Sequence, residues 1–172
     1  MNISADSVIN VGDRWYMNDD AVSGSRSYVV MDGGTVNVTG NSYFNDDADV
    51  DSEAYFTLNA GTFNGGGIID VSWNLDGLSH LTINGGVLQG EGLLWNMTDS
   101  MIVFVDGELR INSVAVSIGD MQALVDTGKI DVSGAAGYAI LTDGDYTVLI
   151  PEPTTLVLLA LGGLGLIRRR KR

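Results

Sequence analysis

The densest group of possible metal ligands lies in an acidic run in the first third of the chain. Asp47, Asp49 and Asp51 have the alternate spacing that opens an EF-hand loop, in which carboxylate oxygens bind calcium. However, Ser52 stands where such a loop needs its turn glycine, and Leu58 stands where the bidentate glutamate is required. The run is therefore not an EF-hand, and a low-affinity Ca²⁺ site competes with a solvated corner loop as its interpretation.

Catalytic residue types are few. The chain has no cysteine, so it has no thiol nucleophile or thiolate metal ligand, and His80 is its one histidine. Paired carboxylates can hydrolyse glycosidic bonds, but the acidic residues are scattered and no spacing selects a pair. We therefore expect a protein that is not an enzyme and has no cofactor. A fragment of a carbohydrate-active enzyme is the most distant alternative.

A second set of residues with a defined chemistry lies at the C-terminus. Pro151 and Pro153 are the only prolines and flank Glu152; because proline fixes φ and lacks an N–H, the pair prevents a helix from crossing this point. An apolar stretch of about 14 residues follows, which as a transmembrane-like helix spans roughly 21 Å and is short for a bilayer. Five cations end the chain: Arg168, Arg169, Arg170, Lys171 and Arg172. The positive-inside rule keeps them cytoplasmic, so that residues 1–150 face outward.

These three parts, in this order, resemble the PEP-CTERM sorting signal of Gram-negative bacteria. The resemblance implies recognition by exosortase, a membrane transpeptidase-like enzyme, during transient anchoring in the inner membrane. It also implies removal of the tail and display at the cell surface or in the exopolysaccharide matrix of a biofilm. An ordinary C-terminal tail anchor is the alternative. The chain then divides into an ectodomain, residues 1–149, and a sorting and anchor segment, residues 150–172.

The N-terminus departs from the pattern expected of an exported protein. Residues 1–6 have neither the cationic nor the apolar region of a signal peptide. We therefore expect the true start to lie upstream, with N-terminal coils of the repeat described below missing from this chain. A misassigned gene start is the other explanation.

The ectodomain is strongly acidic. Residues 1–150 hold 21 acidic residues against four basic ones, a net charge of −17. Such a field repels nucleic acid and anionic lipid, so we expect no nucleic-acid partner. The 23 glycines and a hydrophobic content of 45% are typical of a β-rich, turn-rich domain.

Four segments of the ectodomain align with one another. Each has apolar residues at alternate positions, as strands do, followed by a glycine-containing step that tolerates positive φ. Their first residues are Tyr28, Tyr55, His80 and Ile102, which are 27, 25 and 22 residues apart. The fourth segment is one residue short at the glycine step. A repeat of this length is the signature of a solenoid.

Two topologies accommodate the repeat. A sandwich or hairpin meander would treat Asn84-Gly85 as a tight reversal, whereas a parallel β-solenoid would treat it as a corner of one coil. The period, with a second apolar strand at residues 68–71, favours an all-β fold: a right-handed parallel β-helix with three short strands in each coil. The pattern resembles the repeats of autotransporter-type passenger domains and the coil-stacked ectodomains of PEP-CTERM proteins.

In a β-helix, equivalent residues of successive coils stack inside. The two expected columns are Val36, Phe63, Leu88 and Leu109, and Met31, Leu58, Ile83 and Val105. The end of the stack must be capped, and we expect a short helix at residues 121–126 with Asp120 as its N-cap and Gly128 at its C′ position. Three strands then follow, at residues 130–132, 138–141 and 146–150, so that the domain ends before Pro151.

These patterns predict an exported β-solenoid that acts as a structural protein of the cell surface or matrix. The main alternative is an adhesin module that binds extracellular polysaccharide through Tyr28, Tyr55, Trp73 and Trp95. Binding predicts a solvent-exposed aromatic row along one face, and catalysis predicts two carboxylates that face each other across a groove. A purely structural role predicts neither.

Overall fold

The computed structural model describes residues 1–18, 24–45, 51–71, 77–94 and 100–152. Almost all the regular structure in these ranges is β-strand, with one short helix. The elements are β1 (Asn2–Ile3), β2 (Val8–Val11), β3 (Trp15–Met17), β4 (Arg26–Val38), β5 (Ser42–Phe44), β6 (Glu53–Gly65), β7 (Ile68–Asp70), β8 (Leu78–Gly90), β9 (Gly92–Leu94), β10 (Met101–Asn112), α1 (Ile118–Asp126), β11 (Ile130–Asp131), β12 (Tyr138–Asp143) and β13 (Tyr146–Pro151).

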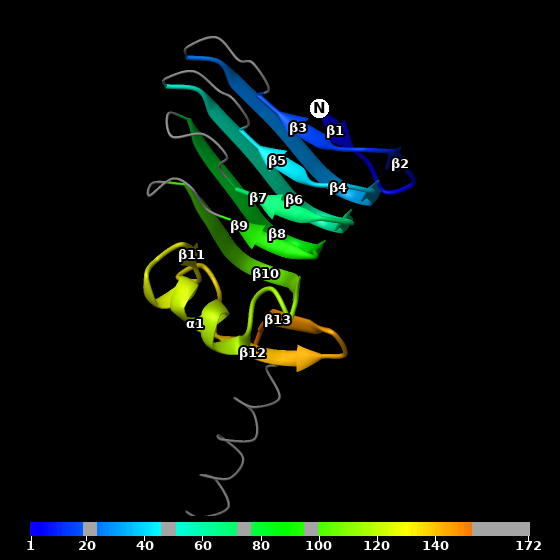
Figure 1. The fold of residues 1–172 in the computed structure, drawn as a ribbon. Helices are drawn as coiled ribbons and strands as arrows, with labels where there is room; N and C mark the ends of the chain where they lie inside the picture. Colours follow the sequence, from blue (N-terminus) through cyan, green and yellow to red (C-terminus); the bar gives the residue numbers. More distant parts are fainter. Residues whose placement is uncertain (19–23, 46–50, 72–76, 95–99, 153–172) are drawn as a thin grey trace, which may run out of the picture.

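The chain winds into a β-solenoid of about four turns. The long strands β4, β6, β8 and β10 pair in parallel, and the short strands β3, β5, β7 and β9 form a second parallel sheet. Figure 1 shows the long strands bent and stacked, with the short strands beside them. Asn84-Gly85 lies within β8 and does not reverse the chain, so the solenoid is confirmed over a meander. The two limbs of each coil that flank the glycine step form one continuous bent strand.

A column of glycines lies at the bend of the long strands. Gly34, Gly61, Gly86 and Gly107 have φ values of 75°, 90°, 75° and 92°. A Cβ added to Gly86 would lie 2.4 Å from the carbonyl oxygen of Gly61, and one added to Gly107 would lie 2.5 Å from that of Gly86. Glycine is therefore required both for the left-handed backbone and for the close approach of one coil to the next.

Two hydrophobic columns fill the inside of the coil. The first is the predicted one: Val36 pairs with Phe63, Phe63 with Leu88 and Leu88 with Leu109, and all four side chains are buried. In the second column, Met31, Leu58 and Ile83 are confirmed at neighbouring inner positions.

The fourth member of the second column is Phe104, and the prediction of Val105 was wrong. Met101, not Ile102, pairs with His80, and Phe104 pairs with Ile83. The cause lies at the bend: Gly107 has the positive φ of Gly86 and faces its carbonyl oxygen as Gly61 faces that of Gly34, so the fourth copy is not one residue short. A slip of one residue moves every side chain of a strand to the opposite face, which is why Phe104 is buried and Val105 only half-buried.

Amide ladders run along the outside of the coils. The Nδ2 of Asn84 donates to Oδ1 of Asn59 at 2.9 Å, and the Nδ2 of Asn59 donates to Oδ1 of Asp32 at 2.8 Å. A second ladder has the same form on the other limb: Asn64 donates to Asn37 at 2.8 Å, and Asn37 donates to Asn10 at 2.9 Å. Polar side chains thus join the coils outside the core as apolar ones do within it.

A non-repetitive cap covers the last coil. β13 pairs antiparallel with β10, β12 pairs with the other side of β13, and the buried Met121 of α1 joins the same core. The helix begins at Ile118 with Ser117 as its N-cap, so the prediction of Asp120 as N-cap was wrong. Asp120 is the third helical residue and completes a capping box with Ser117. Gly128 follows the C-cap with φ +74°, as predicted.

The C-terminal helix expected from the apolar stretch falls in residues 153–172, which lie outside the described ranges. Among the described residues, no helix has the length and apolar character that crossing a membrane requires. The transmembrane-like helix and the right-handed sense of the coil therefore stay predictions.

Candidate functional site

The folded domain extends into the predicted sorting signal. β13 continues to Pro151 and does not end before it, and Pro151 pairs with Tyr138 of β12. The N–H of Glu152 donates a hydrogen bond to the carbonyl oxygen of Gly137 at 3.1 Å. Pro153 and the five cations predicted as the membrane stop lie outside the described residues. The start of the signal is thus part of the last β-hairpin.

Glycine at position 137 allows this contact. A Cβ on Gly137 would lie 3.0 Å from Oε2 of Glu152, 3.2 Å from its Cδ and 3.4 Å from its Cβ. The side chain of Glu152 therefore lies directly over the Cα of Gly137. Glu152 is exposed on its other side, whereas Pro151 is half-buried.

An aromatic row follows the outer face of the long strands. The rings of Tyr28 and Tyr55 are stacked with centroids 5.0 Å apart and 6° between their planes, and those of Tyr55 and His80 at 4.9 Å and 16°. These three residues pair with one another in β4, β6 and β8, which confirms the predicted equivalence of His80 with the two tyrosines. Tyr28, at the end of the row, is 55% exposed. Trp73 and Trp95, the other predicted binding residues, lie outside the described ranges.

A second aromatic pair lies on the sheet of short strands and was not predicted. The rings of Tyr16 and Tyr43 stack at 5.1 Å with 11° between their planes. The sequence signal is an aromatic residue at the centre of each of the first two short strands, 27 positions apart, and it is weak because a three-residue strand shows too little alternation. Trp15, by contrast, points inward and packs edge-on against Phe63 with ring centroids 5.7 Å apart.

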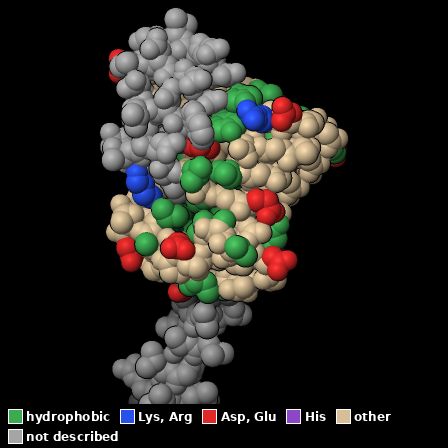
Figure 2. Space-filling view, viewed as in Figure 1, with side chains coloured by type: hydrophobic (Ala, Val, Ile, Leu, Met, Phe, Trp, Pro, Cys, Tyr) green, Lys and Arg blue, Asp and Glu red, His purple; other side chains and the backbone are tan. Residues whose placement is uncertain are grey.

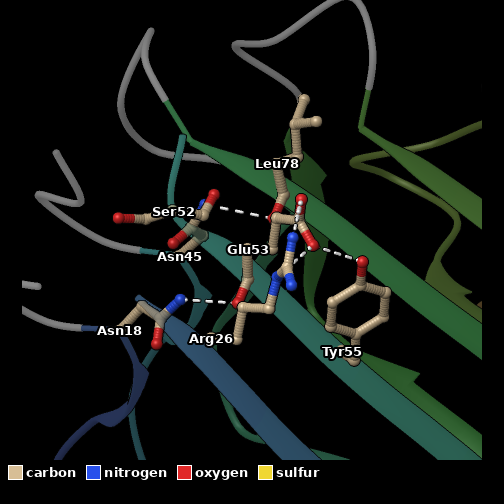
Figure 3. Close-up of polar contacts among 7 residues, drawn as sticks. All are labelled: Asn18, Arg26, Asn45, Ser52, Glu53, Tyr55 and Leu78. Carbon is tan, nitrogen blue, oxygen red and sulfur yellow. Dashed lines mark hydrogen bonds and ion pairs between the residues drawn. The ribbon is translucent and has the colours of Figure 1, made fainter. Parts of the chain in front are cut away.

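Glu53 is held by two donors at the edge of the exposed aromatic row (Figure 3). The hydroxyl of Tyr55 donates a hydrogen bond to its carboxylate, and Arg26 donates two, from Nε at 3.0 Å and from Nη2 at 3.3 Å. The hydrogen bond from Tyr55, then that from Arg26, hold the pKa of Glu53 below its usual range. The same bond to Glu53 raises the pKa of Tyr55. Glu53 is therefore a charged acceptor that ties β4 to β6, and it is unsuited to act as a general acid.

Two asparagines fix the corner that follows each of the first two short strands. Asn18 and Asn45 have left-handed φ values of 52° and 81°. The Nδ2 of Asn18 donates to the carbonyl of Glu53 at 2.7 Å, and that of Asn45 donates to the carbonyls of Ser52 at 3.2 Å and Leu78 at 3.1 Å (Figure 3). Each amide thus reaches the start of a later long strand. The signal for both is an asparagine followed by two aspartates, repeated 27 residues apart.

The predicted calcium ligands are only partly described. Asp47 and Asp49 lie outside the described ranges, while Asp51 is exposed and has a left-handed φ of 66°. Within the described ranges, no group of three or more histidines or carboxylates is placed to hold a metal ion. The calcium site stays a prediction.

Carboxylates on the described surface are dispersed. Figure 2 shows acidic side chains as separate groups over the coloured part of one face, among small hydrophobic groups. Several pair with arginines: Arg110, for example, contacts Glu108 at 2.9 Å and Asp143 at 2.7 Å. These pairs neutralise charges locally. Residues 1–150 still carry a net charge of −17, so acidic residues dominate the long-range electrostatic field.

The comparison with protein families finds a match at the C-terminus. Residues 149–172 match the PEP-CTERM protein-sorting motif. No curated protein and no solved structure matches the chain. The predicted sorting motif is thus confirmed, and it is attached to a domain of the predicted β-solenoid type.

Proposed function

We propose that this protein is a structural component of the cell surface or of the exopolysaccharide matrix, delivered there by exosortase. The PEP-CTERM motif implies an exported protein with transient membrane anchoring before processing. The observation that carries the proposal is the position of the motif, which begins within β13, the last strand of the cap on the β-solenoid. A folded domain is thereby delivered without an intervening linker.

The surface chemistry of the coils supports a structural role. Stacked rings, amide ladders and ion pairs use side chains of one coil to hold the next. Such contacts give a quasi-one-dimensional domain in which each coil is stabilised by its neighbours. An extended acidic body of this kind suits a scaffold that stays soluble and keeps away from anionic surfaces.

Export and processing are tested with the full chain, fused to a cleavable leader and carrying an epitope between that leader and Met1. It is expressed in a Gram-negative host with an exosortase and in an isogenic strain without the enzyme. We expect a shortened product in the surface or matrix fraction of the first strain and a full-length product in the inner membrane of the second. Identical size and location in both strains would contradict the proposal. A variant with Arg168 to Arg172 replaced by glutamine tests the membrane stop.

The aromatic row supports a second candidate, a polysaccharide-binding adhesin. Its rings cover each other's faces, so they offer edges and hydroxyls along the row and an accessible tyrosine at the end, Tyr28. The net charge of −17 in residues 1–150 opposes binding of acidic glycans, so a neutral polysaccharide is the expected ligand, with Trp73 and Trp95 as further contacts.

Affinity electrophoresis in gels containing a neutral polysaccharide separates the two candidates. An adhesin is retarded, and Tyr28→Ala lowers the retardation, whereas Ile118→Ala, an exposed apolar change on the cap, does not. Unchanged mobility of the original protein across neutral glycans would leave the scaffold role as the better account.

A further inference from the structure

The first two residues of the sorting signal are occupied by contacts within the folded domain. Antiparallel pairing of Pro151 with Tyr138, together with the bond from Glu152 N–H to Gly137 O, makes the proline a member of a non-hydrogen-bonded pair. In such a pair the N–H points away from the partner strand, so a proline fits without loss of a ladder hydrogen bond. The Pro-Glu step can therefore be part of the hairpin even though proline usually disrupts strands.

The pairing of β13 with its neighbouring strands decreases towards the sorting signal. β13 is paired with β10 on one side and β12 on the other up to Leu149, but Ile150 and Pro151 pair with β12 alone. Beyond them, the bond between Glu152 and Gly137 and the contact of the Glu152 side chain with the Gly137 Cα hold the end in place. The last three residues can thus separate from β12 while the rest of β13 stays in the core.

We propose that β12 and Gly137 compete with exosortase for Pro151 and Glu152, so that the signal must separate from the hairpin before the enzyme binds it. This inference rests on the proposed function, in which exosortase processes this chain. An enzyme that recognises Pro151 and Glu152 needs access to their backbone and side chains. In the closed hairpin, Gly137 accepts the Glu152 N–H and covers one side of its carboxylate. The folded cap therefore sets how often the signal is available.

A disulfide across the end of the hairpin tests the need for separation. Ala139 and Ile150 are directly paired, and their place next to the non-hydrogen-bonded pair puts their Cα atoms about 5.5 Å apart, within the range of a disulfide. The chain has no cysteine, so Ala139→Cys with Ile150→Cys forms one defined bridge in an oxidising compartment. We expect processing of the full chain to slow at least about ten-fold when bridged and to recover on reduction. The two single variants control for effects of the cysteines and of the reductant on the enzyme.

A variant that destabilises the closed hairpin tests the same separation of the signal from β12 in the opposite direction. Gly137→Val places a branched side chain where a Cβ already meets Oε2 of Glu152 at 3.0 Å. Loss of one ordinary hydrogen bond shifts an open–closed ratio by about five-fold, so we expect processing about five-fold faster. Ala136→Val changes an exposed neighbour by the same kind of residue and should process at the original rate. Thermal unfolding of each variant verifies that the solenoid is intact.

The results distinguish failure of the competition by β12 from failure of the proposed processing by exosortase. If the original chain is not processed in the exosortase strain, both fail. If the original chain is processed, and the bridged and Gly137→Val variants are processed at the same rate as it, only the competition by β12 is refuted. Slower processing of the bridged form together with faster processing of Gly137→Val supports it.

Discussion

The two ends of the coil stack differ in how they bury the same kind of residue. At the capped end, Leu109 and Ile111 of the last coil are fully buried beneath β13. At the other end, Ile3 and Met17 of the first coil are buried. Ile9, Val11 and Trp15 of the same coil face the same core but are only half-buried. Among the described residues, no strand pairs with the outer edges of β1, β2 and β3. Stacking thus completes the burial of inner coils, whereas a terminal coil needs a different element to cover it.

The cap is effective because its geometry departs from the repeat. β13 runs antiparallel to β10, and its partner β12 returns along it as a hairpin. α1 adds Met121 to the core from outside the sheets. One closed, non-repetitive unit thus covers the last coil and leads the chain directly to the sorting signal.

The largest expected effect comes from truncating a buried residue of the cap. Leu149→Ala removes a fully buried side chain from β13, and we expect a loss of about 2–5 kcal/mol in the free energy of unfolding. Val11→Ala at the open end should cost about 1 kcal/mol, because its side chain is only half-buried. Denaturant unfolding of the full chain measures both, and equal losses would show that the two ends are equally packed.

Glycine-to-alanine changes at the bend of the long strands test whether the two ends of the stack are held with different firmness. Gly34 and Gly107 both have positive φ, and a Cβ on either would lie 2.5 Å from a carbonyl oxygen of the preceding coil. The oxygens that face Gly34 belong to Ser4 and Ser7 in the first coil, which no further strand covers among the described residues, so we expect them to yield more readily than the carbonyl of Gly86. We expect Gly34→Ala to cost about 1–2 kcal/mol, the strain of the left-handed backbone alone, and Gly107→Ala to cost more.

The thermal midpoints of the two glycine variants provide the measurement. A larger fall for Gly34→Ala than for Gly107→Ala would mean that the first coil is held as firmly as the inner ones.

Removal of the N-cap residue of α1 is expected to have a smaller effect on stability, confined to the C-terminal end of the coil stack. Ser117 accepts a hydrogen bond from the Asp120 N–H at 3.2 Å and is the N-cap of α1. Ser117→Ala should cost about 1 kcal/mol and increase amide exchange in α1 and the hairpin while leaving β4 and β6 unchanged. Hydrogen exchange read by mass spectrometry tests this, and Val114→Ala, at a site that is 96% exposed just before the helix, serves as the control. Uniform exchange changes along the chain would contradict an independently opening cap.

The smallest expected effect is a change in the thermal stability of the protein at acid pH. Hydrogen bonds from the Ser117 side chain and backbone lower the pKa of Asp120. A carboxylate with a lowered pKa in the folded state stabilises it fully above its ordinary pKa of about 3.9 and loses that contribution as the pH falls through the lowered value. The difference in thermal midpoint between the original protein and Asp120→Asn should therefore be constant near neutral pH and shrink below about pH 4. A difference independent of pH would assign the effect of Asp120 to packing.

The errors made from sequence occurred where several local solutions were equally good. Ser117 and Asp120 can both cap a helix, and the choice depends on where the chain leaves β10. Ile102 and Met101 both begin an alternating segment, and only the stacking of Gly107 on Gly86 selects the register. The pairs formed by Tyr16 with Tyr43 and by Asn45 with Leu78 join residues far apart in sequence, so local patterns carry little trace of them.

The amino-acid sequence was sufficient to predict the repeat, the inner columns of the first three copies, the cap elements and the sorting motif. These depend on alternation, glycine placement and a run of proline, apolar and cationic residues, all of which are local properties. The register of the last copy, the partners of Glu53 and the hydrogen bond from the Glu152 N–H to Gly137 became known only from the tertiary structure. Those features depend on which coils become neighbours, and the distances between coils are set only when the core has packed.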